Sequence, residues 1–162
     1  MRSLFVALAL AVAPFQAFAA DVAPAFSVRD LSNTTQTLAQ YKGKVVLLNF
    51  WATFCGPCKV EMPHLQSMYQ ELGPKGLVIL GVSMDDARFQ AQVKPMVMGL
   101  RLTYPIIADP QGVVYSKYNP GKTMPYNVIV DAQGRIAHVH SGYNAGDEKT
   151  VRAEIEALLA KP

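Results

Sequence analysis

Both cysteines of this 162-residue chain lie in one segment, NFWATFCGPCKVEMP at residues 49–63, with only two residues between them. The run KVVLLNFW at 44–51 is almost entirely apolar, which is typical of a strand buried on both faces. The apolar spacing that follows predicts a helix from about Cys55 to Leu72, ended by a Gly-Pro pair. The cysteine pair therefore lies where a buried strand passes into a helix, and any fold of this chain must contain that junction.

A cysteine pair can serve as a structural staple, a metal clip or a redox couple. A disulfide that closes so short a loop stabilises a fold by only about 2 kcal/mol, too little to hold a domain of this size together. Structural zinc takes four ligands, usually from two close pairs, and no second Cys or His pair has matching spacing. The pattern therefore favours a redox couple, in which two thiols alternate with a disulfide.

The two cysteines have different expected roles. Cys55 is expected to be the exposed nucleophile, because free N–H groups and the positive dipole end at a helix N-terminus stabilise a thiolate. Cys58 lies one turn into the helix and can attack a mixed disulfide formed at Cys55, so it is expected to be the resolving thiol. Gly56 permits close approach of a substrate chain, and Pro57 presets a helical φ where no N–H donor is needed.

The N-terminus reads as an export signal. It has one basic residue, an apolar run at 4–13, a proline and then small residues. An uncleaved anchor is the alternative, but the run is about half of the roughly 20 residues that a membrane span needs. We therefore expect a signal peptide over 1–19 and one domain over 20–162, in the periplasm or another extracytoplasmic space where disulfides persist. The formal net charge of +3 is mild and argues against a nucleic-acid partner.

The remaining periodicities indicate alternating strands and helices. Further strands are expected at 26–31, 77–83, 104–109, 126–131 and 135–141, and further helices at about 89–100, 112–118 and 147–160. Asp85 and Asp86 are expected to cap the helix at 89–100, and Pro95 to kink or shorten it. The last two strands form a hairpin around the turn DAQG. This order indicates an α/β fold with a central mixed β-sheet flanked by helices.

Several segments resemble one known family. The export signal, APAFSVRDL, GKVVLLNFWATFCGPCKVEMP, LGVSMDD and MPYNVIVDAQGRI are together similar to the TlpA/ResA-like branch of the thioredoxin family. The resemblance covers nearly all of 23–160. It implies a thioredoxin-like fold with an N-terminal strand extension and a central strand-helix insertion at 85–120.

The same resemblance implies an activity and partners. Members of that branch are exported thiol-disulfide oxidoreductases, so protein thiols and disulfides are the expected substrates, for example those of apocytochrome c during cytochrome c biogenesis. A membrane thiol-electron transporter is the implied reductant. We expect a monomer that needs no cofactor and no metal.

Glu61 lies three residues after Cys58, so the two side chains can share a helix face. Taken alone, a helix carboxylate is more often simply solvated. The resemblance implies instead that Glu61 manages the proton of the resolving thiol, as a general base. Thioredoxin itself has a buried acid where this chain has Asn49. Because an amide does not titrate, Glu61 is the candidate carboxylate for Cys58.

Pro125 stands before a buried strand in TMPYNVIVD, where thioredoxin relatives have a cis proline beside the disulfide. X–Pro bonds are cis in only about 5–6% of cases in folded proteins, so this expectation rests on the resemblance. A cis bond would turn the Met124 backbone towards Cys55 and leave it free to pair with an extended substrate segment. The residues PYN depart from the threonines more usual after this proline, which bears on substrate preference.

Aromatic and imidazole side chains complete the set of candidates. Trp51 and Phe54 flank the cysteine turn. Core packing is the ordinary explanation for both side chains, and for Phe54 a place at the rim of the site is an equally good explanation. As candidates for function, both are expected to contact an apolar side chain of a substrate. His138 and His140 alternate along one strand and permit a metal pair, but two exposed imidazoles on a solvated face are far commoner.

Two other functions use the same residues. A redoxin-type thiol peroxidase shares the topology, but its peroxidatic cysteine needs a threonine three residues earlier, where this chain has Ala52. A copper or metal chaperone would use the thiol pair directly, although no further soft ligand is nearby. Hydrogen peroxide consumption and Cu(I) binding distinguish these alternatives from a protein-disulfide reductase.

Overall fold

The computed structural model describes residues 22–161, so the signal peptide predicted at 1–19 lies outside the described residues. The strands are β1 (Ser27–Arg29), β2 (Thr35–Thr37), β3 (Val45–Trp51), β4 (Leu77–Ser83), β5 (Ile106–Ala108), β6 (Tyr126–Val130) and β7 (Ile136–Ser141). The helices are α1 (Gly56–Leu72), α2 (Gln90–Gly99), α3 (Tyr115–Tyr118) and α4 (Asp147–Leu159), with short 3-10 turns η1 (Ala39–Tyr41) and η2 (Gly73–Lys75). Within 22–161, no helix combines the length and the hydropathy needed to cross a membrane.

Five strands form a mixed sheet in the order β5-β4-β3-β6-β7. Strand β4 runs parallel to both β3 and β5, whereas β6 pairs antiparallel with β3 and with β7. Every residue of β3 and β4 is buried, which explains why both strands read as continuous apolar runs. The predicted α/β class, with a central mixed sheet and a C-terminal hairpin, is confirmed.

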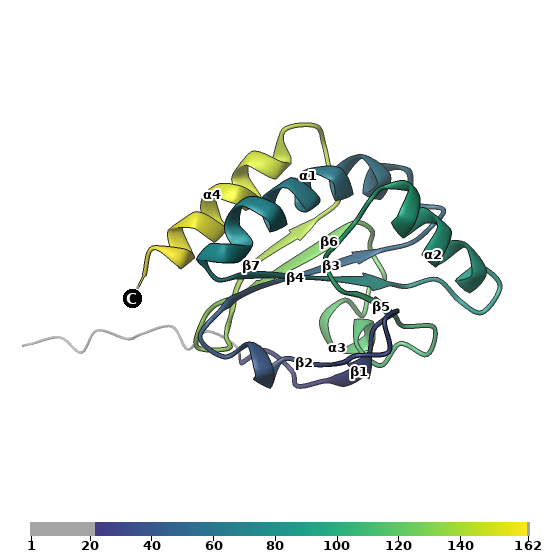
Figure 1. Ribbon diagram of the computed structural model, residues 1–162, viewed down its shortest axis with the longest axis horizontal. Helices are drawn as coiled ribbons and strands as arrows, with labels where there is room; N and C mark the ends of the chain where they lie inside the picture. Colours follow the sequence, from purple (N-terminus) through teal and green to yellow (C-terminus); the bar gives the residue numbers. More distant parts are fainter. Residues whose placement is uncertain (1–21, 162) are drawn as a thin grey trace, which may run out of the picture.

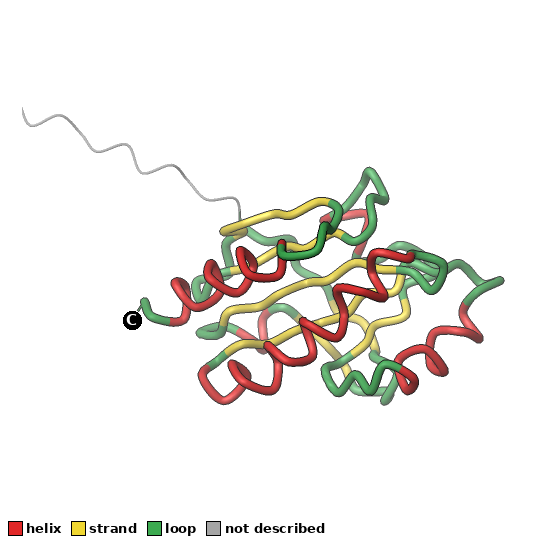
Figure 2. Tube along the Cα trace, turned by 90° about the horizontal axis from the view of Figure 1, so that it is seen from above, coloured by secondary structure: helices red, strands yellow, loops and turns green. Residues whose placement is uncertain are grey.

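The two faces of the sheet are covered by different parts of the chain (Figure 1). Helices α1, α2 and α4 lie on one face, and α1 and α4 pack side by side there (Figure 2). Helix α3 and the β1–β2 pair lie on the other face. Residues of β3 alternate between two cores: Leu47 and Trp51 pack under α1, whereas Leu48 and Phe50 pack on the opposite side. Strand β3 is thus held from both sides, and its last residues lead directly into the cysteine turn.

The expected extension and insertion are both present, with two differences in detail. The extension is a two-stranded sheet in which β2 pairs with β1, a strand that the polar sequence TQT did not indicate. The insertion at 85–120 contains α2, β5 and α3, and α2 is short, with Pro95 inside it. The prediction that Asp85 and Asp86 cap α2 is wrong, because Phe89 is the N-cap residue and both carboxylates have other partners.

Candidate active site

Cys55 and Cys58 form a disulfide at the N-terminus of α1. Strand β3 ends at Trp51, and a turn closed by the Cys55 N–H donating to the Ala52 carbonyl, at 3.0 Å, brings the chain to the helix. Cys55 is the N-cap residue, and its Sγ accepts a hydrogen bond from the Cys58 backbone N–H at 3.2 Å. The first sulfur therefore occupies the place where a helix stabilises negative charge.

The two sulfurs differ in accessibility, but less than the sequence suggested. Cys55 retains 8% of its surface and Cys58 none. The description of Cys55 as exposed is thus corrected: the residue is nearly buried in this disulfide state, and it is the only one of the pair that an approaching chain can reach. Gly56 and Pro57 beside it are exposed, and a Cβ added at Gly56 would meet nothing within 4 Å. The approach to Cys55 is therefore open on the side of the turn.

The two aromatic candidates occupy opposite situations. Trp51 has no exposed surface and packs in the same core cluster as both cysteines, so it forms the floor of the site and does not meet a substrate directly. Core packing is therefore the explanation for Trp51, because its strand is covered by α1. Phe54 is 58% exposed, and its ring lies 5.3 Å from that of Phe89, in the loop before α2. Phe54 and Phe89 together make an apolar surface beside Cys55.

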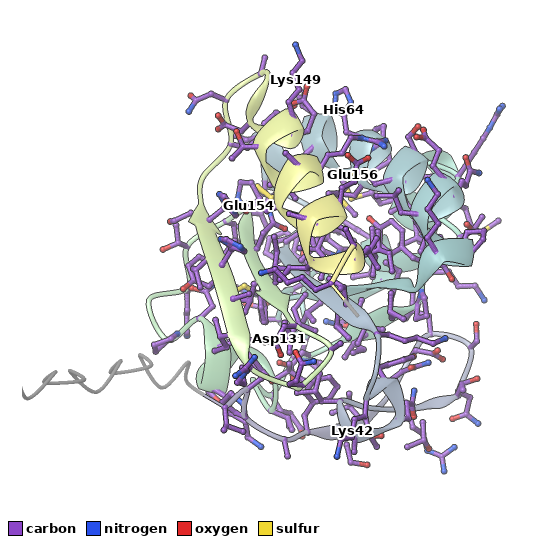
Figure 3. The ribbon with its side chains drawn as sticks, turned by 90° about the vertical axis from the view of Figure 1, so that its left-hand side faces the viewer. Lys42, His64, Asp131, Lys149, Glu154 and Glu156 are labelled. Atoms are coloured by element: carbon purple, nitrogen blue, oxygen red, sulfur yellow. A yellow bond between two sulfur atoms is a disulfide. The ribbon has the colours of Figure 1, made fainter. Side chains whose placement is uncertain are left out.

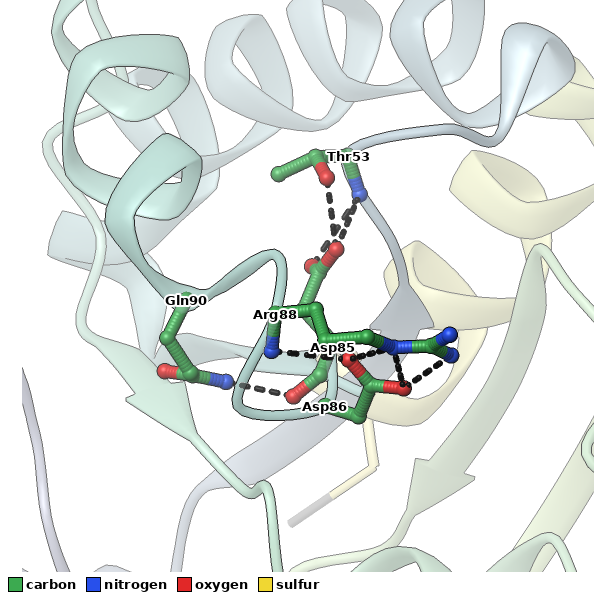
Figure 4. Close-up of polar contacts among 5 residues, drawn as sticks. All are labelled: Thr53, Asp85, Asp86, Arg88 and Gln90. Atoms are coloured by element: carbon green, nitrogen blue, oxygen red, sulfur yellow. Dashed lines mark hydrogen bonds and ion pairs between the residues drawn. The ribbon is translucent and has the colours of Figure 1, made fainter.

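The buried carboxylate of Asp85, predicted to be a helix cap, instead holds the cysteine turn in place (Figure 4). Asp85 has no exposed surface and accepts hydrogen bonds from the Thr53 N–H at 3.0 Å and the Thr53 hydroxyl at 2.6 Å. The Ser83 hydroxyl donates to it at 2.8 Å. Asp86 instead pairs with Arg88 at the surface, at 2.6 Å. Asp85 thereby ties the residues before Cys55 to the end of β4.

The proline candidate lies in the expected conformation. The Met124–Pro125 peptide bond is cis, as the resemblance implied. Met124 is partly buried and packs against the cluster that contains the cysteines. The Pro125 carbonyl accepts the Gly142 N–H at 2.8 Å, which extends the pairing of β6 with β7.

Glu61 is buried, with 2% of its surface exposed, so the interpretation of a solvated helix carboxylate is wrong. The Asn127 side-chain amide donates to one carboxylate oxygen at 2.5 Å, and the Asn49 amide donates to the other at 3.0 Å. Asn49 also donates to the Asn127 oxygen at 2.8 Å. Asn49 was a candidate from the sequence, but Asn127 was not, and its one signal there is an amide in the otherwise apolar strand YNVIV.

This environment changes the acidity of Glu61. Burial raises the pKa of Glu61 from its ordinary value of 4.5 to about 7. The two asparagine hydrogen bonds and the charge of His140 oppose that rise, and Asp147 adds to it. A carboxyl group with a pKa near 7 can both accept and release a proton at neutral pH, which is what a general acid-base requires.

The raised pKa also predicts how stability depends on pH. Between the unfolded and folded pKa values, the folded protein holds a proton at Glu61 that the unfolded chain has released. Stability conferred by this group is thus complete below the unfolded value and is lost as pH rises through about 7. Relative to the wild type, the Glu61→Gln variant should gain about 3 kcal/mol of unfolding free energy between about pH 4 and pH 8.

Urea denaturation at a series of pH values measures this difference. Glu71→Gln is the matched control, because Glu71 lies on the same helix but is solvent-exposed and bonded to Arg152. It should show no such gain. Parallel pH profiles for the wild type and Glu61→Gln would contradict a buried, proton-binding Glu61.

The two strand histidines share one partner. The side chains of His138 and His140 lie on the sheet face covered by α4, where His138 Nδ1 is 3.3 Å and His140 Nε2 is 2.6 Å from the two oxygens of Glu154. They are partly covered by this helix, which the expectation of a solvated strand face did not include. Within residues 22–161, no group of three or more His, Cys, Asp or Glu side chains is arranged to hold a metal ion.

Comparison with known proteins places this site in a family. The model of the AhpC/TSA family matches residues 19–139. The chain belongs to the AhpC/TSA family. Within that family it is similar to thiol-disulfide oxidoreductase ResA of Oceanobacillus iheyensis, 36% identical over 126 residues, which cover 75% of this chain and 64% of that protein. It thus spans slightly less than two thirds of that relative's length.

The chain is also similar to a thioredoxin-like protein and to a thiol:disulfide interchange protein. The thioredoxin-like protein YneN of Bacillus subtilis is 35% identical over 83% of this chain and 78% of its own length. The crystal structure of a thiol:disulfide interchange protein DsbE from Chlorobium tepidum superposes with a TM-score of 0.80 at 26% identity, over 87% of this chain and 97% of that one. The fold is therefore thioredoxin-like, and the relatives include the thiol-disulfide oxidoreductase ResA.

Proposed function

We propose that this protein is an extracytoplasmic oxidoreductase that reduces protein disulfides through Cys55 and Cys58. The observation that carries the proposal is the place of Cys55 Sγ, which caps α1 and accepts the Cys58 N–H at 3.2 Å. The same N–H would stabilise the Cys55 thiolate in the reduced protein. Cys55 keeps a small exposed surface beside the open turn and can be reached by a substrate, whereas Cys58 is fully buried and protected.

The reaction takes two exchanges. The Cys55 thiolate attacks a substrate disulfide, so that a Cys55–substrate disulfide forms and the first substrate sulfur leaves as a thiolate. Cys58 then attacks Cys55, the Cys55–Cys58 disulfide forms and the second substrate sulfur leaves. Two electrons pass from the protein to the substrate, and Cys58 must lose its proton before it attacks. Glu61, three residues along α1 and titrating near neutral pH, is the base that we assign to that proton.

Substrate would approach along the exposed side of the turn. We assign the Met124 backbone, before the cis Pro125, to pairing with an extended substrate segment as an added strand. Gly56 and Pro57 leave room for that segment beside Cys55. The exposed Phe54 ring would cover an apolar side chain next to the substrate cysteine.

The compartment determines the electron supply. The signal-like residues 1–19 support export, and disulfides persist outside the cytoplasm. Net reduction there requires a donor, for which we propose a membrane thiol-electron transporter. Apocytochrome c is the substrate we propose first, by analogy with the TlpA/ResA-like branch.

A comparison of two substrates tests the proposed activity. The reduced protein should accelerate reduction of insulin disulfides by dithiothreitol, and should consume hydrogen peroxide no faster than a free thiol does. Rapid peroxide turnover without insulin reduction would establish a thiol peroxidase instead. The Thr53 hydroxyl argues against that outcome, because it is bonded to Asp85.

A further inference from the structure

A row of polar side chains crosses the sheet beneath α1. Asn49 pairs with Asn127 across β3 and β6, and Asn127 pairs with His140 across β6 and β7. Residues directly opposite one another in neighbouring strands point to the same face, so all three side chains lie on the face covered by α1 and α4. The row begins at the buried Glu61 carboxylate, which both amides hold, and ends at the imidazole of His140.

His140 is held at the outer end of this row. Its Nε2 lies 2.6 Å from a Glu154 oxygen, and about a quarter of each side chain is exposed. Figure 3 shows Glu154 on the side of α4 that faces β7. Because Nε2 is engaged by Glu154, Nδ1 is the nitrogen available to exchange a proton on the other side of the ring.

A pocket joins His140 to Glu61. It has a volume of about 170 Å³ and is lined by Glu61, Asn127 and His140, with Asp147 and Thr150 of α4 at its edge. Those two α4 residues are exposed, so the pocket opens to solvent. A water molecule takes up about 30 Å³ in the liquid, so the pocket has room for several. Glu61 is therefore almost fully buried, yet this pocket leads from its carboxylate past the His140 imidazole to solvent.

We infer that His140, positioned by Glu154, is the proton outlet of Glu61. This inference rests on the proposed function, in which Glu61 takes the proton of Cys58. As Cys58 attacks Cys55, the sulfur–sulfur bond between them forms, the bond from Cys55 to the substrate breaks, and the substrate leaves as a thiolate. The Cys58 proton passes to Glu61, then through water in the pocket to His140, and from there to solvent. His140 acts through Glu61 and is a positioning residue.

The charges around the path favour this direction. The titratable groups that shift the pKa of Glu61 are His140 from β7 and Asp147 from α4. The Glu61 carboxylate in turn helps to raise the pKa of the Tyr104 and Tyr143 phenols in neighbouring loops. His140 is the one that lowers the pKa of Glu61, and Asp147 raises it. Asp147 lines the pocket and is exposed, so its carboxylate attracts a proton towards solvent. Loss of His140 should thus raise the pKa of Glu61 and remove the imidazole that passes its proton on to solvent.

The single tryptophan provides the measurement. Trp51 packs in the cluster that contains both cysteines, so its fluorescence can follow formation of their disulfide. Reduced protein mixed with excess oxidised glutathione should show a concentration-dependent phase for attack by Cys55 and a concentration-independent phase for attack by Cys58. The rate constant of the second phase should fall at acid pH as Glu61 becomes protonated. In His140→Gln, this acid limb of the pH–rate profile should move up by about half a pH unit, which is roughly a threefold loss of rate below the inflection. Imidazole added to His140→Ala should restore part of the rate.

His138→Gln is the matched control, because His138 lies on the same strand and meets the other oxygen of Glu154 but does not line the pocket. Its profile should coincide with that of the wild type. An unchanged acid limb in a folded His140→Gln protein would overturn the inference, as would an equal shift in His138→Gln. A second phase that persists in Cys58→Ser would instead show that the proposed two-cysteine mechanism is wrong.

Discussion

Replacement of Cys55 by serine should reduce insulin-disulfide reduction to the rate of dithiothreitol alone. The thiolate is the nucleophile in disulfide exchange, and a serine hydroxyl does not ionise at neutral pH. Cys58 cannot take over, because it has no exposed surface. Insulin turbidity measured with wild-type and variant protein gives the result directly. Full activity in Cys55→Ser would contradict the mechanism.

Replacement of Cys58 by serine should instead trap the mixed disulfide between Cys55 and the substrate. Cys58→Ser leaves the nucleophile in place but removes the thiol that resolves the mixed disulfide. It should therefore accumulate a covalent adduct with insulin chains, visible on a non-reducing gel and released by reductant. Lys59→Ser is the matched control, since Lys59 is the next residue of α1, exposed and without a thiol. It should turn over normally and trap nothing.

Replacement of Asp85 by alanine should destabilise the protein by about 3 kcal/mol or more, because the Thr53 N–H, the Thr53 hydroxyl and the Ser83 hydroxyl would lose their buried acceptor. The cysteine turn should also become mobile, because Thr53 is two residues before Cys55. Urea denaturation measures the first effect, and the alkylation rate of reduced Cys55 measures the second. Asp85→Asn retains the shape and one acceptor oxygen, so its loss should be smaller.

Asp86→Ala is the control for this prediction. Asp86 is adjacent in sequence, but its contact with Arg88 is solvent-exposed, and exposed ion pairs contribute little to stability. Its unfolding midpoint should stay near that of the wild type. Equal midpoints for Asp85→Ala and Asp86→Ala would show that the buried carboxylate does not anchor the turn.

Local pattern was sufficient for the elements and for the cysteines. The apolar run before Cys55 indicated a strand covered on both faces, and β3 is one, with all seven residues buried. The place of Cys55 at a helix N-terminus followed from the apolar residues after that strand, which recur at helical spacing. The hairpin of β6 and β7 followed from two alternating segments around a tight turn. Each of these predictions depends on residues only a few positions apart.

The surroundings of Glu61 and Asp85 could not be predicted in that way. Nothing near Glu61 in sequence shows that it is buried, because its partner Asn127 is 66 residues away. Asp85 looked like a helix cap, since its bond to Thr53, 32 residues earlier, is invisible to local spacing. The sequence left both core packing and substrate contact open for Trp51, and its complete burial in the core under α1 decides for core packing.

The strand-helix junction, the position of the two thiols and the α/β class can all be predicted from local residue patterns, because hydrophobic periodicity and turn residues act over short stretches of chain. Three properties of the site depend instead on the folded chain: which carboxylate is desolvated, which aromatic ring stays exposed and which histidine lies beside the buried acid. Those properties depend on the packing of α1 and α4 against strands distant in sequence, and burial is what changes the acidity of a side chain.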